Sequence, residues 1–576
     1  MKKLNIIGIL SIAILVVSCN SILDKEPLDT FTNENFWTSE SNVEGYANAF
    51  YENFSGYGNG GGSGDYYFKT LSDDQAGSSF ADWNYTSIPA SSSNWNNNWI
   101  EIRRANILLE HVDEITSMTT TEKAHWNGVA HLMRAWTYYQ LVRMYGDVPW
   151  INKSLDITDT GYLYSERTSR EVVMDSVLND LNYACTNMYN TTSRITLNQS
   201  VAYAMKAEIC LYEGTFRKYR LATDNQLEPD LSGSTKYLTA AKEACAAIMS
   251  NSDYSLNDSY QGNYNSLNLS SNKEMILYKA YNLDVLMHSL IDYTSSSSQM
   301  SGMTKDAFDS YLFKDGKPLG LTSEDKNDAA FIHFGTKIVA DEAVADTVLS
   351  LHKVLDVRDA RLLQTIDTAL CYVSRGFTRF NIGMSMTSST GYGVAKYDNQ
   401  SIDLQHRSQT GTNYTDAPLF WLSEVYLEYA EACAELGTAT QNDLDISVNK
   451  LKKRAGLPDL SVNVGFTDPA NTIGVSDLIW EIRRERRCEL MFDNYIRYWD
   501  LIRWHQLDKL DSSMNPNILI GANIVNDPYD TAVSRIDNYI NASKGKTRVY
   551  DKKYYLYPIP SDQISLNPKL GQNFGW

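Results

Sequence analysis

The sequence predicts a mainly α-helical fold of TPR-like helical hairpins, with long irregular loops and a few short strands. Apolar residues recur at helical spacing in successive segments of the chain. Several of these segments begin at capping motifs or end at glycine and proline. Small side chains occur where neighbouring helices would cross and so allow close packing: Ala202, Ala204, Ala207, Ala241 and Ala244. A generic helical bundle is the alternative to TPR-like hairpins.

The N-terminus has the pattern of a lipoprotein signal peptide, residues 1–18. Lys2 and Lys3 precede an apolar stretch over residues 4–17, which is too short for a comfortable membrane span. The stretch ends at Val16-Val17-Ser18-Cys19, which has the form of a lipobox. Cleavage before Cys19 would leave this cysteine to carry lipid, anchoring the protein to the membrane without spanning it. An uncleaved anchor helix is the alternative.

A polar tether is expected over residues 19–38, followed by one globular unit over residues 39–576. Its N-terminal part, about 39–250, carries the first helical segments, which are expected at 39–54, 96–115, 200–213 and around 238–248. Two further helices begin at capping boxes, at 119–122 and at 168–171. The first of these two ends near Gly146 and Pro149. Its C-terminal part is about 251–576. There, residues 251–416 are expected to be irregular, with a strand near 274–278. Helices return at 417–436, 444–454, 475–492 and 495–507, and residues 554–560 read as extended because prolines exclude a helix.

The composition excludes some classes of function. The net charge is −19, so nucleic acid is an unfavourable partner, because its binding depends on neutralising phosphates. The eight histidines are scattered and form no HExxH motif, so no metal or other cofactor is expected. Six further cysteines read as free thiols in a core: Cys185, Cys210, Cys245, Cys371, Cys433 and Cys488. Their spacing predicts no disulfide framework, although an exported protein can pair some of them.

Several segments, in the same order along the chain, resemble the SusD/RagB family of outer-membrane lipoproteins. They include a start at residues 23–27, a YYQLVRMYGDVP run within 134–149, and EVYLEYAEACAELG at 424–437. The series continues with IRRERRCELMFDNYIRYWDLIRW at 482–504 and ends with PIPSDQISLNPKLGQNFGW. Two positions depart from the family pattern: Asn494 replaces a usual glycine, and Tyr498 intervenes before Trp499.

The resemblance implies a SusD-like α-α superhelix with four helical hairpins as scaffold. It also implies a cell-surface lipoprotein at the outer membrane that captures a glycan, or less often a peptide. The implied partner is a SusC-like TonB-dependent transporter, to which the ligand is delivered. The alternatives are a surface glycoside hydrolase, and a lid or scaffold for the transporter that binds no soluble ligand.

Candidate binding residues were sought where aromatic rings and planar polar groups occur together, because a sugar stacks on rings and its hydroxyls need partners. A glycine-rich loop at residues 55–64 leads into an aromatic, Asp-rich and Asn-rich segment ending at residue 85, and long loops often carry function. The predicted site comprises Trp83, Asn84, Tyr85, Asp73, Asp74, Tyr66 and Tyr67, with Tyr293 and Tyr392 as weaker candidates. Packing against the scaffold is the alternative role for each aromatic residue. The basic run at residues 483–487, interleaved with glutamates, is expected to be a salt-bridged structural helix rather than an anion site.

Overall fold

The computed structural model describes most of the chain after the signal peptide and tether. The described residues are 36–61, 64, 66, 71–77, 82–224, 227–295, 301–339, 342–370, 372, 377–379, 384–386, 388–527 and 533–576. The predictions for Cys19, Tyr67 and Cys371 therefore lie outside the described residues. Within the described residues, no helix has both the length and the apolar character needed to cross a bilayer.

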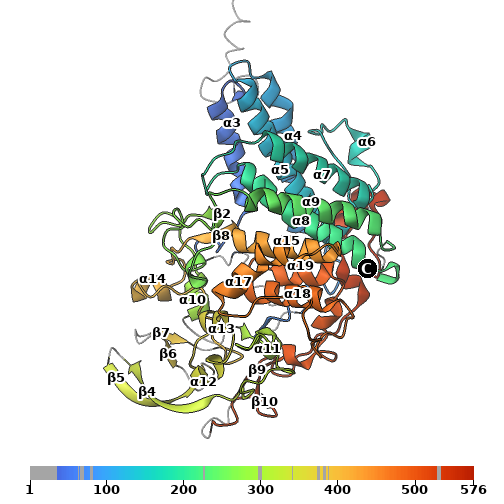
Figure 1. Cartoon of the computed structure of the whole chain (residues 1–576). Helices are drawn as coiled ribbons and strands as arrows, with labels where there is room; N and C mark the ends of the chain where they lie inside the picture. Colours follow the sequence, from blue (N-terminus) through green and yellow to red (C-terminus); the bar gives the residue numbers. More distant parts are fainter. Residues whose placement is uncertain are drawn as a thin grey trace, which may run out of the picture.

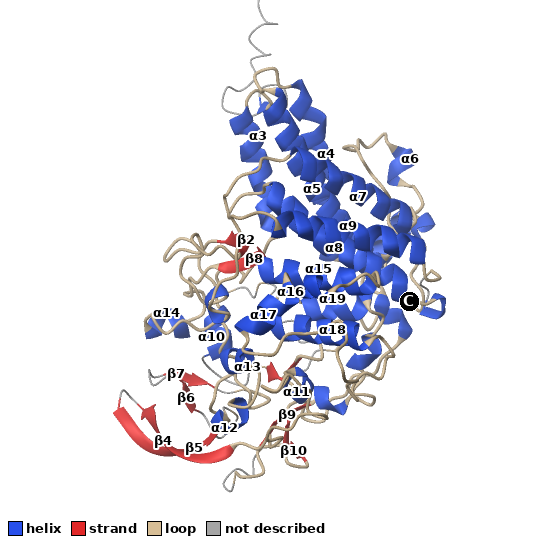
Figure 2. Cartoon of the chain, viewed as in Figure 1, coloured by secondary structure: helices blue, strands red, loops and turns tan. Residues whose placement is uncertain are grey.

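The N-terminal part is a stack of helices in which α4 packs against α5, α5 against α7, α7 against α8 and α8 against α9, while α3 packs against α5 (Figure 1). The predicted helices are confirmed, with these bounds: α3 (Glu40–Ala47), η1 (Asn48–Asn53), α4 (Ser93–His111), η2 (Val112–Glu114), α5 (Thr120–Tyr145), α7 (Arg170–Asn187), α8 (Gln199–Tyr219) and α9 (Leu231–Met249), with short α6 (Thr160–Leu163) and η3 (Ala222–Asp224) between them. The described chain is mainly helical, as the sequence predicts (Figure 2).

The helix ends show how local sequence sets these bounds. Thr119 and Glu122 form the predicted capping box at the start of α5, and Gly146 ends the helix with φ 73°, a conformation that favours glycine. The prediction of a capping box at the start of α7 is wrong, because the N-cap residue Ser169 makes no side-chain capping hydrogen bond. Thr168 pairs with Val148 in an isolated β-bridge instead, and the carboxylate of Asp147 accepts the hydrogen bond from the Arg170 N–H at 2.8 Å.

The helix expected from residue 417 begins later, at α15 (Leu422–Glu435). The residues before it form β8 (Ala417–Trp421), which pairs antiparallel with β2 (Met275–Lys279). All five residues of β8 are buried, so their apolar character does not distinguish a strand from a helix. The strand predicted near residues 274–278 is confirmed as β2.

The middle of the chain is more regular than predicted. The strands β4 (Phe331–Val339) and β5 (Glu342–Ser350) pair in a long antiparallel hairpin at one end of the molecule (Figure 2). The other strands are short: β1 (Gln75–Ala76) with β3 (Gly302–Met303), β6 (Phe377–Arg379) with β7 (Met384–Met386), and β9 (Ile520–Asn523), β10 (Arg535–Ile536) and β11 (Tyr539–Asn541) in one sheet. Short helices lie between them: η4 (Gln261–Asn263), α10 (Leu290–Ser295), α11 (Lys305–Ser310), α12 (His352–Leu355), α13 (Ala360–Thr365) and α14 (Leu404–Ser408).

The C-terminal helices return to the centre of the molecule, where α15 packs against α8, α9 and α18. Their bounds are α16 (Gln441–Asp445), α17 (Val448–Arg454), α18 (Asp477–Glu489), α19 (Ile496–Arg503), η5 (Leu507–Leu510), η6 (Pro516–Ile518), η7 (Lys552–Tyr555), α20 (Ser561–Leu566) and η8 (Pro568–Leu570). The helix predicted over 444–454 is thus two helices, and the segment predicted as extended begins with a 3-10 turn that ends at Tyr555.

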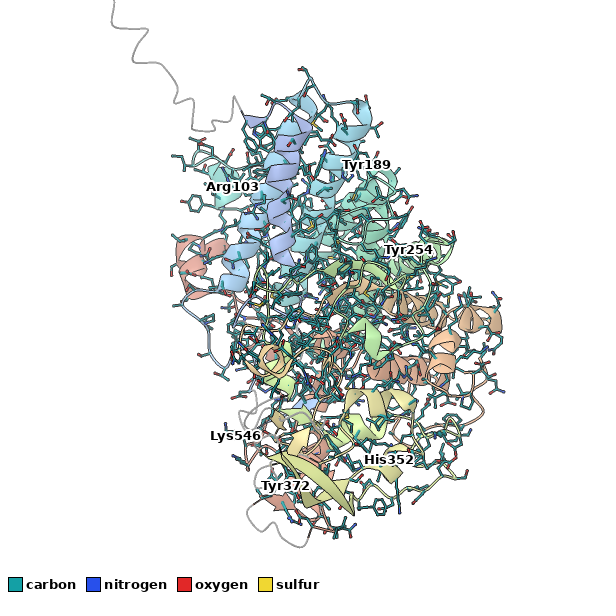
Figure 3. All side chains as sticks on the ribbon, turned by 90° about the vertical axis from the view of Figure 1, so that its left-hand side faces the viewer. Arg103, Tyr189, Tyr254, His352, Tyr372 and Lys546 are labelled. Atoms are coloured by element: carbon teal, nitrogen blue, oxygen red, sulfur yellow. The ribbon has the colours of Figure 1, made fainter. Side chains whose placement is uncertain are left out.

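A single large apolar core runs through both parts of the chain. The five cysteines that the structure describes, Cys185, Cys210, Cys245, Cys433 and Cys488, are free and buried, as predicted. In the view turned by 90°, Tyr189 lies among the N-terminal helices, whereas His352 lies toward the opposite end, beside the long hairpin (Figure 3).

Candidate ligand-binding site

Trp83, the residue on which the predicted site centres, packs against the C-terminal segment. Only 6% of its surface is exposed. The ring of Tyr554 stacks on it at 4.2 Å between centroids, with 9° between the planes. The indole N–H donates to the backbone oxygen of Val549 at 2.7 Å. These contacts are those of the alternative role, packing against the scaffold, and they leave little ring surface for a sugar.

Asp73 and Asp74 lie in a buried network of arginines. Arg497 donates to Asp73 at 2.6 Å and 2.7 Å, and Arg487 donates to Asp74 at 2.8 Å. Burial alone would raise the pKa of Asp73, but the charges of Arg487 and Arg497 hold it well below its ordinary value. Burial raises the pKa of Asp74, against the charge of Arg487. Their oxygens are engaged within the protein rather than presented to a ligand as sugar-hydroxyl acceptors.

The remaining predicted tyrosines are also held within the fold, at separate places. The Tyr66 hydroxyl donates to the Pro418 oxygen at 2.5 Å, and Tyr293 donates to the Gly61 oxygen at 2.9 Å. Tyr392 is fully buried and stacks on Phe308 at 4.7 Å. The Tyr85 hydroxyl shares a hydrogen bond with Ser92, and its ring contacts Tyr557 edge-on. The structure therefore brings Tyr293 to the glycine-rich loop but does not gather the predicted residues into one site.

Asn84 is the predicted residue that reaches a large cavity. Its amide donates to the Tyr557 hydroxyl at 2.7 Å. The cavity has a volume of about 400 Å³ and lies where α4, α5 and α8 meet β8, α15, α18 and α19. We call it the central cavity. This size falls within the usual range for small-molecule sites, roughly 300–1,000 Å³.

Amide and aromatic side chains form much of the lining of the central cavity. The amides are Asn53, Asn84, Asn94, Asn98, Gln140 and Asn494, of which Asn84 and Asn94 are exposed. Rings from α5, α8, β8, α19 and three loop positions share this lining: Phe54, Trp136, Tyr139, Tyr212, Phe420, Tyr495, Trp499 and Tyr557. An amide both donates and accepts hydrogen bonds, as a sugar hydroxyl does. The combination of rings and planar polar groups that the sequence placed around Trp83 therefore occurs here.

Three carboxyl groups with few partners also line the central cavity. Glu424 and Glu428 lie one turn apart on α15, and Glu208 comes from α8. The nearest cation to Glu424 is Arg486, at 3.6 Å, and Glu208 accepts a 3.4 Å hydrogen bond from Tyr139. Burial raises the pKa of all three groups, and the mutual repulsion of their charges adds to the rise for Glu424 and Glu428.

Some buried polar atoms of the central cavity have no hydrogen-bond partner among the described residues. They are an acceptor, Glu428 Oε1, two donors, Arg486 Nη1 and Arg143 Nε, and the Tyr212 hydroxyl. Leaving such groups unpaired costs about 1–3 kcal/mol each, so a ligand that offers both donors and acceptors would gain by entering. Within the described part of the chain, no group of three or more His, Cys, Asp or Glu residues is placed to hold a metal ion.

Sequence reasoning missed the central cavity because its residues come from segments far apart in the chain. One local signal was available: glutamates at positions 424, 428 and 431 recur on one face of an otherwise apolar helix. The basic run of α18 is salt-bridged, as predicted, but most of its partners lie on other elements. Arg483 pairs with Glu435, Arg486 with Asp500, and Arg487 with Asp74 and Asp306.

The helical scaffold defines the fold, and sequence comparison identifies the family. The sequence pattern of the SusD family matches residues 242–576. A second family pattern, described as starch-binding and associating with the outer membrane, matches residues 23–211. Because the first match covers more than half of the chain, the protein belongs to the SusD family.

Individual relatives agree with this assignment. A SusD-like protein of Formosa agariphila, P38, is 24% identical over 89% of this chain and 94% of its own length. A SusD-like carbohydrate-binding protein of Bacteroides fragilis superposes with a TM-score of 0.69 at 20% identity, covering 93% of this chain and 99% of that one. A laminarin-binding SusD-like protein superposes with a TM-score of 0.55 at 17% identity, covering 94% and 100%.

Proposed function

We propose that this protein is a cell-surface lipoprotein that captures a glycan and delivers it to a SusC-like TonB-dependent transporter. Membership of the SusD family supports this proposal, as do the carbohydrate-binding and laminarin-binding proteins that share the fold. The lipobox at Cys19 supports attachment to the outer membrane through lipid. We propose binding without turnover, so purified protein should release no reducing ends from the polysaccharide that it binds.

We place the glycan in the central cavity. The observation that carries this assignment is the set of unpaired donors and acceptors that line it beside aromatic rings. A neutral pyranose offers hydroxyls that satisfy both kinds of group and C–H faces that pack on the rings. Asn84 is the residue that joins this site to the one predicted from sequence.

A single substitution separates ligand binding from folding. The hydroxyl of Tyr212 has no partner among the described residues, so Tyr212→Phe removes nothing on which the fold depends. If the hydroxyl meets a sugar, glycan affinity should fall by about 3- to 10-fold, the equivalent of one neutral hydrogen bond. Unfolding stability should be unchanged or slightly higher. Affinity gels with a polysaccharide panel that includes laminarin and starch, together with urea unfolding, measure both effects.

The matched control is Tyr138→Phe. Tyr138 lies outside the central cavity, donates to the Ile151 oxygen at 3.0 Å and accepts from the Ile151 N–H at 2.6 Å. This variant should lose stability by about 1–3 kcal/mol and keep its affinity. Equal glycan affinity of wild type and Tyr212→Phe would refute the central cavity as the site. If no glycan in the panel is bound while peptides are, the ligand class is wrong, and co-purification with the barrel without any soluble ligand would favour the lid or scaffold role.

A further inference from the structure

A second cavity, of about 510 Å³, lies against another face of α18. We call it the α18 groove. Its cationic and aromatic lining includes Trp480, Arg483, Arg484, Arg487, Arg497 and Lys509. They come from α18, α19 and η5. Arg486, which lines the central cavity, does not line the α18 groove.

Most of the cations in the α18 groove are already neutralised. Arg484 pairs with Glu481 at 3.0 Å and also with Asp468. Arg487 donates to Asp306 at 2.7 Å, and Arg497 pairs with Asp73 at 2.6 Å. These carboxylates leave the three guanidinium groups with little charge to offer a ligand.

Lys509 differs from these arginines. Among the described residues, no carboxylate lies within ion-pair distance of its ammonium group, and the nearest contact is the face of Trp480, with Nζ 5.1 Å from the ring centroid. Burial and the charge of Arg497 lower the pKa of Lys509 to about 8, against the charges of Asp73 and Asp306, which raise it. The adjacent carboxylate of Asp508 acts on His505 and Tyr550. The groove therefore holds one cation without an ion-pair partner among the described residues, although Asp306, Asp309, Asp468 and Asp508 also line it.

Arg483 supplies an independent second observation. It is only 4% exposed and lies between the rings of Tyr219, at 4.8 Å, and Trp504, at 4.5 Å. Its Nη2 donates to Glu435 at 2.9 Å, but Nε and Nη1 have no partner among the described residues. Buried guanidinium N–H groups prefer charged oxygen acceptors, which form the stronger hydrogen bonds.

We propose that the α18 groove binds an oxyanion, the sulfate ester or the carboxylate of an acidic sugar. Both groups present charged oxygens, which the unpaired ammonium of Lys509 and the open N–H groups of Arg483 require. The net charge of −19 disfavours a polyanion such as nucleic acid, so a local anionic group is the anion considered. The anion site is inferred from the residues of the groove alone. That the anion belongs to a sugar rests on the proposed function.

The test is calorimetric titration of the full-length mature protein with inorganic sulfate and, separately, with glucuronate. Lys509→Gln should weaken the binding of the preferred anion by about 10-fold or more, the loss expected for one charge-assisted contact. The matched control is Lys553→Gln, because Lys553 also lies over a tryptophan ring, Trp576, at 4.6 Å and lines neither cavity. It changes the net charge equally and should leave the affinity unchanged.

The outcomes separate the two anion sources and the two proposals. Preference for sulfate indicates a sulfated sugar, and preference for glucuronate indicates a uronic acid. Equal weakening by Lys509→Gln and Lys553→Gln, or no binding of either anion, would overturn the site. If the anion binds at Lys509 while no glycan binds the protein, the groove stands and the proposed function fails. If neutral glycans bind and neither anion does, the proposed function stands and the anion site fails.

Discussion

At the scale of single residues, the contacts of a side chain separate a ligand-facing role from a structural one, whereas its type does not. Trp83 and Tyr212 are both aromatic and nearly buried, at 6% and 3% exposure. Every polar group of the Trp83 side chain has a partner within the fold, and its ring is stacked. Tyr212 keeps a hydroxyl without a partner among the described residues, beside a cavity.

Trp83→Ala tests this distinction directly. The change removes a stacked ring and a 2.7 Å hydrogen bond to Val549. It should destabilise the protein by about 3–5 kcal/mol, as expected for truncating a buried tryptophan. The folded fraction should bind glycan with unchanged affinity, which urea unfolding and affinity measured at low temperature can show. Loss of binding by a variant of wild-type stability would instead restore Trp83 as a binding residue.

At the scale of elements, the sequence predicts most helices but not the partners of their polar residues. Periodicity and capping motifs identify α5 and α18, because these signals are local. The start of α15 is predicted wrongly because β8 is stabilised by pairing with β2, a segment far away in the chain. The partner of Glu431 is likewise distant: Arg503 of α19 donates to it at 2.5 Å and 2.8 Å.

The acidic face of α15 predicts an unusual dependence of stability on pH. Burial alone would raise the pKa of Glu431, but the charge of Arg503 lowers it to about 2, so its stabilisation is lost as the pH falls from 4.5 toward 2. Burial raises the pKa of Glu424 to about 8. Between pH 4.5 and 8 the folded protein then holds a proton that the unfolded chain has released, so stability should fall as the pH rises.

The free energy of unfolding in urea, measured from pH 3 to pH 8, checks this prediction. In the absence of ligand, the contribution of Glu424 should decline between pH 4.5 and pH 8. Glu424→Gln should flatten the decline above pH 4.5, whereas Glu44→Gln, at an exposed position on α3, should leave the profile unchanged. Identical pH profiles of Glu424→Gln and wild type above pH 4.5 would show that Glu424 is ionised in the folded protein.

At the scale of the whole molecule, the order of family motifs predicts the class of fold, but not how the ends of the chain meet. The C-terminal segment returns to the first helices: the Tyr557 N–H donates to Met144 at 2.7 Å, and the Ser561 N–H donates to Pro89 at 3.0 Å. This return covers Trp83 with Tyr554 and places Tyr557 in the lining of the central cavity. No local pattern encodes such contacts, so the sequence could not show that the C-terminal segment covers Trp83.

If these contacts make residues 39–576 one folding unit, a change at the C-terminus should weaken the N-terminal helices. Asn573 is 4% exposed, and its amide donates to the oxygens of Tyr145 at 3.0 Å and Tyr557 at 2.8 Å while accepting from Arg167 at 2.7 Å. Asn573→Ala leaves these buried groups unpaired and should cost about 1–3 kcal/mol. The loss should appear as a shift of one unfolding transition and as faster hydrogen exchange in α5.

The neighbouring Phe574→Ala is the control, because Phe574 is 49% exposed and should change stability by no more than about 0.5 kcal/mol. Local fraying and global coupling then give different results. Fraying of the C-terminus alone would speed exchange after residue 549 while α5 kept its protection. Coupling would lower the protection of both, because the groups that lose their partner belong to α5 and the C-terminal segment alike. The second result is expected, since the lining of the central cavity includes residues of both.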